Sequence, residues 1–263
     1  MLRLKIIVCI KLVPAVTNVK INPETGTLIR DGLESEVNPF DMYAMEEAIR
    51  LKEKHGGQVI VISMGPQQAE YALREALALG CDEAILLTDK KFAGADTLAT
   101  SYTLSAAIKK IRTFDLIICG HKTTDGDTGQ VGPGLAEWLN IPHVSYVRKI
   151  LQVTDDIIIV ERSMDNFYEE IEIPQPCLIT VTKEINVPRL PSFRRKIQAR
   201  KMSIRIWSSE DLDGEGLFGL ENSPTRVLKV FHPQPRSGGE MIHGNPKRQV
   251  EQLINKLKDR KIL

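Results

Sequence analysis

Short, continuous apolar runs, separated by segments of helical periodicity, are the feature that most constrains the fold of this chain. Residues 6–10 (IIVCI), 59–62 (VIVI) and 116–119 (LIIC) are three of these runs. An apolar run without polar interruption is typical of a central parallel strand, because helices cover both faces of such a sheet. Strand and helix patterns alternate with short connections, which predicts a doubly wound, mostly parallel α/β sheet.

A polar, glycine-rich loop, residues 120–133 (GHKTTDGDTGQVGP), follows the run 116–119. Open α/β sheets bind ligands in such loops, at the carboxyl ends of the strands. The helix expected after the loop offers free N–H groups and a partial positive charge, which suit a phosphate or pyrophosphate. The loop therefore predicts nucleotide binding. Asp127 and Gln130 have the spacing of a capping box, which predicts that Asp127 caps this helix.

A second informative stretch is Asn38-Pro39-Phe40-Asp41. Asn38 and Pro39 suit the N-cap and the first position of a helix, and Asp41 favours its first turn electrostatically. The helix is expected to continue to His55, where two glycines end it.

After residue 142 the pattern changes to short β segments with turn residues between them. The pairs 155–156 and 165–166 are expected to turn two hairpins. The expected strands are residues 144–147, 149–153, 157–162, 169–173 and 177–181, the last of which is apolar enough to rejoin the main sheet. Nearer the N-terminus, residues 20–21 and 27–29 flank a turn-like stretch, which predicts a small β-hairpin excursion.

Prolines and glycines punctuate the chain from Pro188 onward, and core-like density falls. A long stretch with little regular structure is unusual inside a compact domain. We therefore expect an α/β nucleotide-binding domain over residues 1–187 and a loop-rich, extended arm over residues 188–263 that packs on another subunit. The arm is expected to end in a helix whose apolar stripe needs a partner; the stripe comprises Val250, Leu253, Ile254 and Leu257.

The overall composition excludes several classes of partner. The net charge of the 263 residues is +1, so nothing global indicates nucleic acid or a membrane surface. No stretch approaches the roughly 20 apolar residues that span a bilayer. The N-terminus has no secretory cleavage pattern, which predicts a cytoplasmic protein without membrane insertion.

The four cysteines are Cys9, Cys81, Cys119 and Cys177, and no two of them form a C-x-x-C pair. Three of them lie in or beside apolar, strand-like runs, where cysteine behaves as a small hydrophobic residue. We expect a core role for them, and neither a metal site nor an iron–sulfur cluster in this chain.

Several motifs resemble those of the beta subunit of electron transfer flavoproteins, over nearly the full length of the chain. The matching segments are residues 37–41 (VNPFD), 48–53 (AIRLKE), 64–66 (MGP), 120–133, 180–186 (TVTKEIN) and 188–189 (PR). The resemblance implies a heterodimer in which this chain binds a nucleotide and its C-terminal segment embraces an FAD-carrying alpha subunit.

The resemblance also implies one of two nucleotides. In one branch of the family the beta subunit holds a structural AMP. In the electron-bifurcating branch the same site holds the adenylate end of a second FAD, whose flavin takes hydride from NADH. That flavin sends one electron to ferredoxin or flavodoxin and the other, through the alpha-subunit FAD, to a flavin-containing dehydrogenase.

Residues 125–133 (DGDTGQVGP) look like the FAD-binding, bifurcating form of the loop. The AMP form typically has a third acidic residue and an Asn-Gln-Thr-Gly ending. The tail, residues 219–227 and 238–242, is similar to the bifurcating branch as well. We therefore expect FAD, with AMP binding and the branch linked to nitrogen fixation as the alternatives.

The residues expected to bind the cofactor lie at the carboxyl edge of the predicted sheet. They are Cys9, Asn38, Phe40, Asp41, Met64, Gly120, Thr124, Asp125, Asp127, Thr128, Gln130, Val131, Gly132 and Pro133.

Different parts of the cofactor are assigned to different members of this set. Thr128 and the N–H groups of Gln130, Val131 and Gly132 are expected to contact the pyrophosphate. Asp125 and Asp127 are assigned to ribose hydroxyls, backbone N–H groups or local capping, because carboxylates repel phosphates. Residues 38–41 are expected to line the adenosine pocket, and Cys9 and Met64 match pocket-lining positions through backbone atoms.

No Ser–His–Asp or paired-carboxylate arrangement indicates a catalytic residue, so the flavin is expected to do the chemistry. An ATP-hydrolysing adenylating enzyme of similar fold would carry a Ser-Gly-Gly-x-Asp-Ser-like loop after the first strand. Here that position reads KLVPA (residues 11–15), which argues against this alternative.

The partner-recognition loop of the family falls at residues 188–196. Phe193 is the exposed apolar side chain expected to insert into the dehydrogenase, with Arg194 and Arg195 in a basic rim. Arg189 and Leu190 complete the expected partner-binding set. No strand or helix pattern includes Phe193; the alternative is a solvated basic turn in which Phe193 packs on its own chain.

Overall fold

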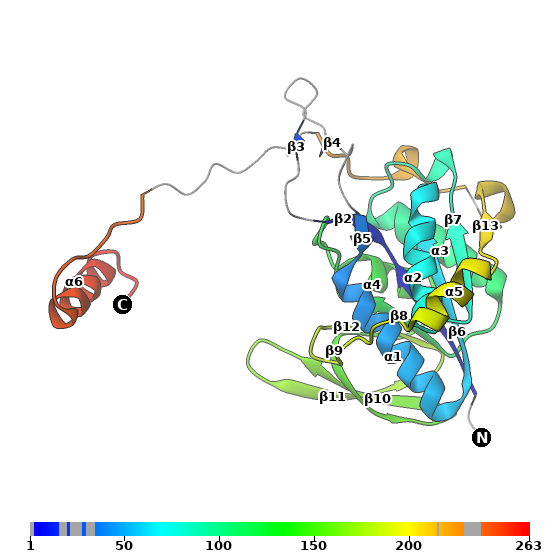
Figure 1. The fold of residues 1–263 in the computed structure, drawn as a ribbon, viewed down its shortest axis with the longest axis horizontal. Coiled ribbons are helices and arrows are strands. Elements are labelled where there is room, and N and C mark those ends of the chain that lie inside the picture. Colours follow the sequence, from blue (N-terminus) through cyan, green and yellow to red (C-terminus); the bar gives the residue numbers. More distant parts are fainter. Residues whose placement is uncertain (1–2, 16–19, 22–27, 30–34, 215, 229–237) are drawn as a thin grey trace.

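The computed structural model describes residues 3–15, 20–21, 28–29, 35–214, 216–228 and 238–263. Nine of the described strands form one sheet (Figure 1). In spatial order they are β11 (Tyr168–Pro174), β10 (Ile157–Ser163), β9 (His143–Val153), β12 (Cys177–Val181), β8 (Leu116–Gly120), β1 (Leu4–Ile10), β6 (Gly57–Met64), β7 (Glu83–Leu87) and β13 (Arg205–Trp207). From β9 to β13 all neighbouring strands pair in parallel, which confirms the predicted architecture.

Six α-helices are present among the described residues: α1 (Pro39–His55), α2 (Glu70–Leu79), α3 (Thr97–Ile111), α4 (Val131–Leu139), α5 (Phe193–Lys201) and α6 (Pro246–Asp259). Two short antiparallel pairs lie outside the large sheet: β2 (Leu12–Pro14) with β5 (Ser35–Val37), and β3 (Lys20–Ile21) with β4 (Leu28–Ile29). The second pair confirms the strands of the predicted hairpin excursion, whose turn lies outside the described residues.

Both faces of the sheet are buried because helices cover each of them, and successive side chains of a strand point to opposite faces. In β1, Ile6 and Val8 belong to the hydrophobic core that includes residues of α1 and α2. Ile7 and Cys9 belong to a second core that includes residues of α3 and α4. The continuous apolar run in the sequence is therefore explained by two cores, one on each face.

The β region after residue 142 differs in one detail from the prediction. β9 is a single strand where two were expected, and Tyr146 interrupts its regularity with a φ of 64°. β10 pairs antiparallel with both β9 and β11, so both predicted hairpins are present. β12 inserts between β8 and β9 and rejoins the main sheet as expected.

Part of the segment 188–263 packs on the sheet, which the sequence did not indicate. α5 contacts α2, and β13 extends the sheet beyond β7. Ala199 is the buried residue of α5, and Leu212 and Phe218 are buried after β13. The helix at residues 193–201 corrects the predicted loop. It escaped prediction because its basic, exposed sequence FRRKIQARK carries no apolar stripe.

The last helix, α6, has no buried residue and lies apart from the sheet (Figure 1). Asn245 caps it, accepting a hydrogen bond from the backbone N–H of Arg248. Its apolar residues Val250, Leu253 and Ile254 are exposed. The domain division at residue 188, and packing of this segment on a second subunit, stay predictions. Within the described part of the chain, no helix is long and apolar enough to cross a membrane.

Candidate functional site

Asn38 joins two segments at the carboxyl edge of the sheet that are far apart in the sequence. Its Nδ2 donates to the carbonyl oxygen of Lys122 (2.9 Å), and its Oδ1 accepts from the backbone N–H of Thr124 (3.2 Å). The side chain is buried and makes no cap hydrogen bond to its own helix. Asn38 stands at the N-cap position, as predicted, but its amide fixes the loop 120–133 instead of capping α1.

Asp41 is buried one helical turn further on, against Gly120. The backbone N–H of Lys11 donates to its carboxylate (2.7 Å), and the N–H of Gly120 does so as well. Burial raises the pKa of Asp41 to about 7, although these hydrogen bonds favour the carboxylate. A Cβ on Gly120 would lie 2.3 Å from Asp41 Oδ1, so only glycine allows this close approach.

The two carboxylates of the loop are each paired with a lysine. Lys11 Nζ lies 2.6 Å from Asp125 Oδ2, and Lys122 Nζ lies 2.6 Å from Asp127 Oδ1. Burial would raise the pKa of Asp125, but the hydrogen bond and the charge of Lys11 outweigh it and lower the pKa. The pairing offsets the negative charge of the loop next to the expected phosphate site.

The predicted capping box is wrong. α4 begins at Val131 with Gln130 at the N-cap position, and no side chain caps it. Asp127 has a φ of 53° and its N–H donates to the carbonyl of Thr123 (2.9 Å), so the chain turns before the helix starts. The Asp127 carboxylate is drawn to Lys122 instead of to the helix.

The start of α4 nevertheless presents the groups that were expected to meet a pyrophosphate. N–H groups of the first helical turn have no partner inside the helix, and here they include those of Val131 and Gly132. Thr128 and Gln130 are exposed beside them. Pro133 has no N–H to offer. Gly132 is also required for packing, because a Cβ there would lie 2.5 Å from Thr180 Cγ2 of β12.

Cys9, Phe40 and Met64 also lie at this edge. Cys9 and Cys119 are register partners on β1 and β8, and both are buried. A hydrogen bond between the two thiols, together with burial, holds the pKa of Cys119 well above its usual range. Met64 ends β6 and packs against the second core. Cys119 is therefore a protonated core residue, and Cys9 is buried beside it.

A small aromatic group that the sequence did not reveal stands beside the loop. The ring of His121 lies 4.2 Å from that of Tyr146 and 6.0 Å from that of Phe40, between centroids. Burial lowers the pKa of His121, which keeps its ring neutral at pH 7. Tyr146 reaches this position from the irregular point of β9, and no sequence pattern indicated that irregularity.

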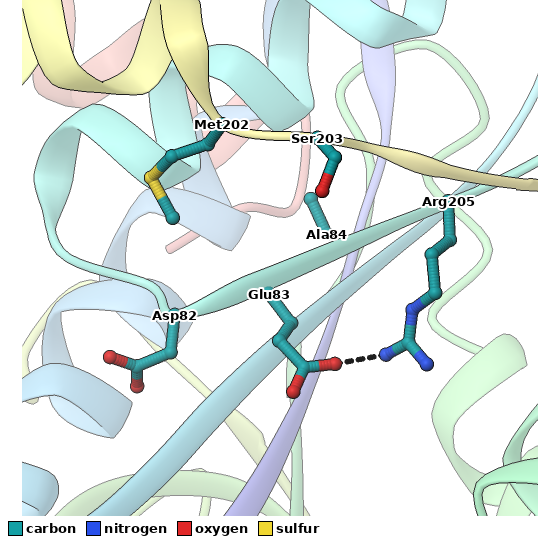
Figure 2. Close-up of a pocket in the computed structure, with 6 residues that line it drawn as sticks. All are labelled: Asp82, Glu83, Ala84, Met202, Ser203 and Arg205. Atoms are coloured by element: carbon teal, nitrogen blue, oxygen red, sulfur yellow. Dashed lines mark hydrogen bonds and ion pairs between the residues drawn. The ribbon is translucent and has the colours of Figure 1, made fainter.

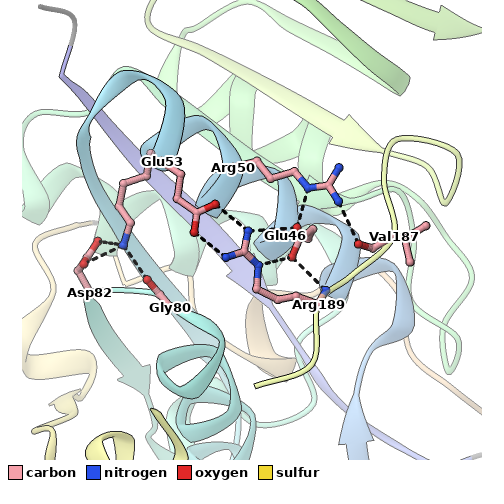
Figure 3. Close-up of polar contacts among 8 residues, drawn as sticks. Glu46, Arg50, Glu53, Gly80, Asp82, Val187 and Arg189 are labelled. Atoms are coloured by element: carbon pink, nitrogen blue, oxygen red, sulfur yellow. Dashed lines mark hydrogen bonds and ion pairs between the residues drawn. The ribbon is translucent and has the colours of Figure 1, made fainter. Parts of the chain in front are cut away.

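The expected partner-binding residues divide into two groups. Leu190 and Phe193 are 91% and 81% exposed, and Arg194 and Arg195 are exposed as well. Arg189 differs, because its guanidinium binds two carboxylates of α1 (Figure 3). The structure thus presents four of these residues to solvent and ties the fifth to the helix.

A cavity of about 250 Å³ lies at the opposite, amino edge of the sheet, between β7 and β13. Figure 2 shows Glu83 and Arg205 as an ion pair in its wall. Asp82, also in the wall, accepts hydrogen bonds from Lys52 and from the backbone of Val59. These three charged side chains are already paired with other groups, and the cavity lies at the edge of the sheet opposite to the loop 120–133. Among the described residues, no three His, Cys, Asp or Glu side chains are placed to hold a metal ion.

The sheet is doubly wound, and a glycine-rich loop leads into a helix at its carboxyl edge. These two features define a class of α/β proteins that bind nucleotides at that edge. Comparison with known proteins identifies the family. The family model described as "Electron transfer flavoprotein domain" matches residues 25–212. The electron transfer flavoprotein subunit beta of Thermoanaerobacterium thermosaccharolyticum is 49% identical over 262 residues, which cover 99% of this chain and 100% of the relative.

Two further relatives carry other names. The Caffeyl-CoA reductase-Etf complex subunit CarD of Acetobacterium woodii is 46% identical over 263 residues, covering 99% of this chain and 100% of the relative. Protein FixA of Azotobacter vinelandii is 42% identical over 262 residues, covering 95% and 93%. The chain therefore belongs to the electron transfer flavoprotein family and is a beta subunit, as its motifs predicted. A beta subunit of this kind works with an alpha subunit and with electron-transfer partners.

Proposed function

We propose that this chain binds FAD at the carboxyl edge of its sheet and, within the heterodimer, accepts hydride from NADH. The electrons then divide between ferredoxin or flavodoxin and, through the alpha-subunit FAD, a flavin-containing dehydrogenase. The observation that carries the proposal is the start of α4, where no side chain caps the N–H groups of the first turn, next to a loop whose two carboxylates are paired with Lys11 and Lys122. An anionic pyrophosphate meets unpaired N–H groups there without meeting unpaired carboxylates.

In this site Thr128 and the first turn of α4 hold the pyrophosphate, and residues 38–41 hold the adenosine. Asp125 and Asp127 shape the loop through their lysine partners and stand near the ribose. FAD, when bound, supplies the hydride and electron transfer, and the chain positions it. The resemblance of residues 125–133 to the FAD-binding form of the loop, which lacks the third acidic residue and the Asn-Gln-Thr-Gly ending of the AMP form, supports FAD over AMP.

Nucleotide content tests the proposal. The chain, co-purified with its alpha subunit, is denatured and the released nucleotides are separated by chromatography. We expect about two FAD and little AMP per heterodimer. About one FAD with one AMP would establish the alternative, a non-bifurcating subunit with a structural AMP. Bifurcation itself predicts that NADH oxidation requires the low-potential acceptor and the dehydrogenase together.

Thr128→Val tests the assignment of the pyrophosphate. It removes one hydroxyl from the exposed loop, and we expect FAD retention to weaken by about 1 kcal/mol. Thr113→Val is the matched control, because Thr113 is an exposed threonine next to the amino end of β8. Equal FAD affinity in both variants would place the phosphate contacts elsewhere.

The dehydrogenase is proposed to dock on residues 188–196. Leu190 and Phe193 offer exposed apolar side chains beside the basic Arg194 and Arg195. A large buried anchor surrounded by charges is a common arrangement in interfaces. Phe193→Ala is expected to cost about 2 kcal/mol of docking while NADH oxidation with an artificial acceptor continues. Lower thermal stability with unchanged docking would identify Phe193 as a packing residue.

A further inference from the structure

Arg189 is held by two carboxylates of α1 (Figure 3). Its backbone N–H and its Nε donate to Glu46 Oε2, at 3.1 and 2.8 Å. Its Nη1 and Nη2 donate to the two oxygens of Glu53, at 2.6 and 2.9 Å. Glu46 and Glu53 are two helical turns apart, so they project from the same face of α1. The planar fork of arginine spans both, which the single ammonium of lysine cannot do.

The same helix holds the backbone on the N-terminal side of Arg189. Arg50 donates from Nε to Glu46 Oε1 (2.6 Å) and from Nη2 to the carbonyl of Val187 (3.2 Å). Asn186 Nδ2 donates to the carbonyl of Tyr43 (3.0 Å). The Val187 side chain itself is 80% exposed. The backbone is therefore fastened to α1 while the apolar side chain is left in solvent.

The charges of this network are stable at neutral pH. Burial would raise the pKa of Glu46, but hydrogen bonds from Arg189 and Arg50 outweigh it and lower the pKa. Hydrogen bonds from Arg189 also lower the pKa of Glu53. The Glu46 side chain is only 4% exposed, so its charge depends on these two arginines.

We propose that Arg189 is a positioning residue, which fastens residues 187–192 to α1 so that Leu190 and Phe193 meet the dehydrogenase in a fixed orientation. The inference rests on the proposed docking surface. Residues 187–192 belong to no helix or strand. An irregular segment that is already ordered loses less conformational entropy when it binds. Arg189 would therefore strengthen docking without contacting the dehydrogenase itself.

A double-mutant cycle on the heterodimer tests the inference. The probe is the flavin-containing dehydrogenase from the same cells that the unmodified heterodimer reduces, and its Kd is measured for Arg189→Met, Phe193→Ala and the double variant. We expect Arg189→Met to raise the Kd about tenfold when Phe193 is present and less than about twofold in the Phe193→Ala background. An equal effect in both backgrounds would show a direct contact or a general structural loss, and would overturn the inference.

Charge is controlled with Lys201→Met, which removes one positive charge from the exposed end of α5. Both substitutions remove one positive charge, so an effect of net charge on Kd should be shared by the two variants, whereas the positioning role predicts a rise of about tenfold for Arg189→Met alone. A rise in Kd of the same size for Lys201→Met would identify an effect of net charge and overturn the inference.

Glu53→Gln decides the case if Arg189→Met fails to fold. It loosens the fork but leaves the buried Glu46 paired with both arginines, and we expect a rise in Kd of about threefold that also disappears in the Phe193→Ala background. A Kd unchanged by Glu53→Gln and by Arg189→Met, with docking still weakened by Phe193→Ala, overturns the positioning role alone. A Kd unchanged by Phe193→Ala would refute the proposed docking surface itself.

Discussion

Helix α1 holds two distant parts of the chain, and it holds them by different means. At its start, the buried Asn38 and Asp41 hold the loop 120–133 through an amide and backbone hydrogen bonds. Further along, the buried Glu46 and the exposed Glu53 hold residues 187–192 through ion pairs with Arg189, whose own side chain is partly exposed.

The two junctions differ in what their loss would cost. A buried polar group left without its partner costs its full desolvation, whereas a partly exposed ion pair contributes little and is screened by salt. The difference indicates that the proposed nucleotide site is rigid and that the proposed docking segment is held more weakly. One helix thus connects a site that must keep its shape with a surface that must bind and release.

Gly120→Ala should have the largest effect, because it breaks the first junction sterically. Its Cβ would lie 2.3 Å from Asp41 Oδ1 and 2.8 Å from the carbonyl carbon of Phe40, so backbone must move. We expect a loss of about 3 kcal/mol in heterodimer stability, with loss of the bound nucleotide. Gly126→Ala in the same loop is the control; its nearest neighbour would be Thr123 Oγ1 at 3.3 Å, and it should be tolerated.

Asn38→Ala is expected to have the second largest effect, a loss of about 2 kcal/mol in stability, since the part-buried N–H of Thr124 and carbonyl of Lys122 lose their hydrogen bonds to the Asn38 amide. Arg50→Ala, in the second junction, removes the bond to Val187 but leaves Arg189 in place on Glu46. Unfolding of the two variants and their nucleotide retention are compared. Equal losses of nucleotide would show that the two junctions are not distinct.

Asp41 gives the first junction a pH dependence. The folded chain keeps the Asp41 proton up to about pH 7, whereas the unfolded chain releases it near pH 4. The resulting stabilisation is complete below about pH 4 and is lost as the pH rises through about 7.

The nucleotide-free heterodimer should therefore lose up to about 1.4 kcal/mol of stability per pH unit between about pH 5 and 7, and Asp41→Asn should lack this decline. Thermal unfolding across this range measures it. Asp155→Asn, in the turn between β9 and β10, is the control and should keep the wild-type slope. A decline that persists in Asp41→Asn belongs to another group.

Salt should produce the smallest effect and should act on the second junction alone. Raising ionic strength from about 0.05 to about 0.5 M is expected to weaken the ion pairs of Arg189 by a few tenths of a kcal/mol. Hydrogen exchange of two amides reports this directly: the Arg189 N–H, bonded to Glu46, should exchange faster, and the Thr124 N–H, bonded to Asn38, should not change. Parallel acceleration of both amides would contradict the comparison.

The sequence by itself determined the architecture and the position of the loop at which the nucleotide site is proposed. The apolar runs predicted the parallel strands because a strand that is buried on both faces consists of consecutive apolar residues. The glycine-rich loop after residues 116–119 predicted a helix start at the carboxyl edge, and Pro39 predicted the first turn of α1. These features depend on neighbours in the chain, so they can be read without knowing what packs against them.

Only the tertiary structure decided which groups meet. Asn38 bonds to residues more than 80 positions away, and Arg189 bonds to a helix more than 130 positions before it. Local spacing assigned Asn38 to helix capping and Asp127 to a capping box, and the family resemblance assigned Arg189 to partner contact. In the folded chain each of these side chains meets a distant hydrogen-bonding or ionic partner. The free energy gained from that pairing determines where the side chain lies.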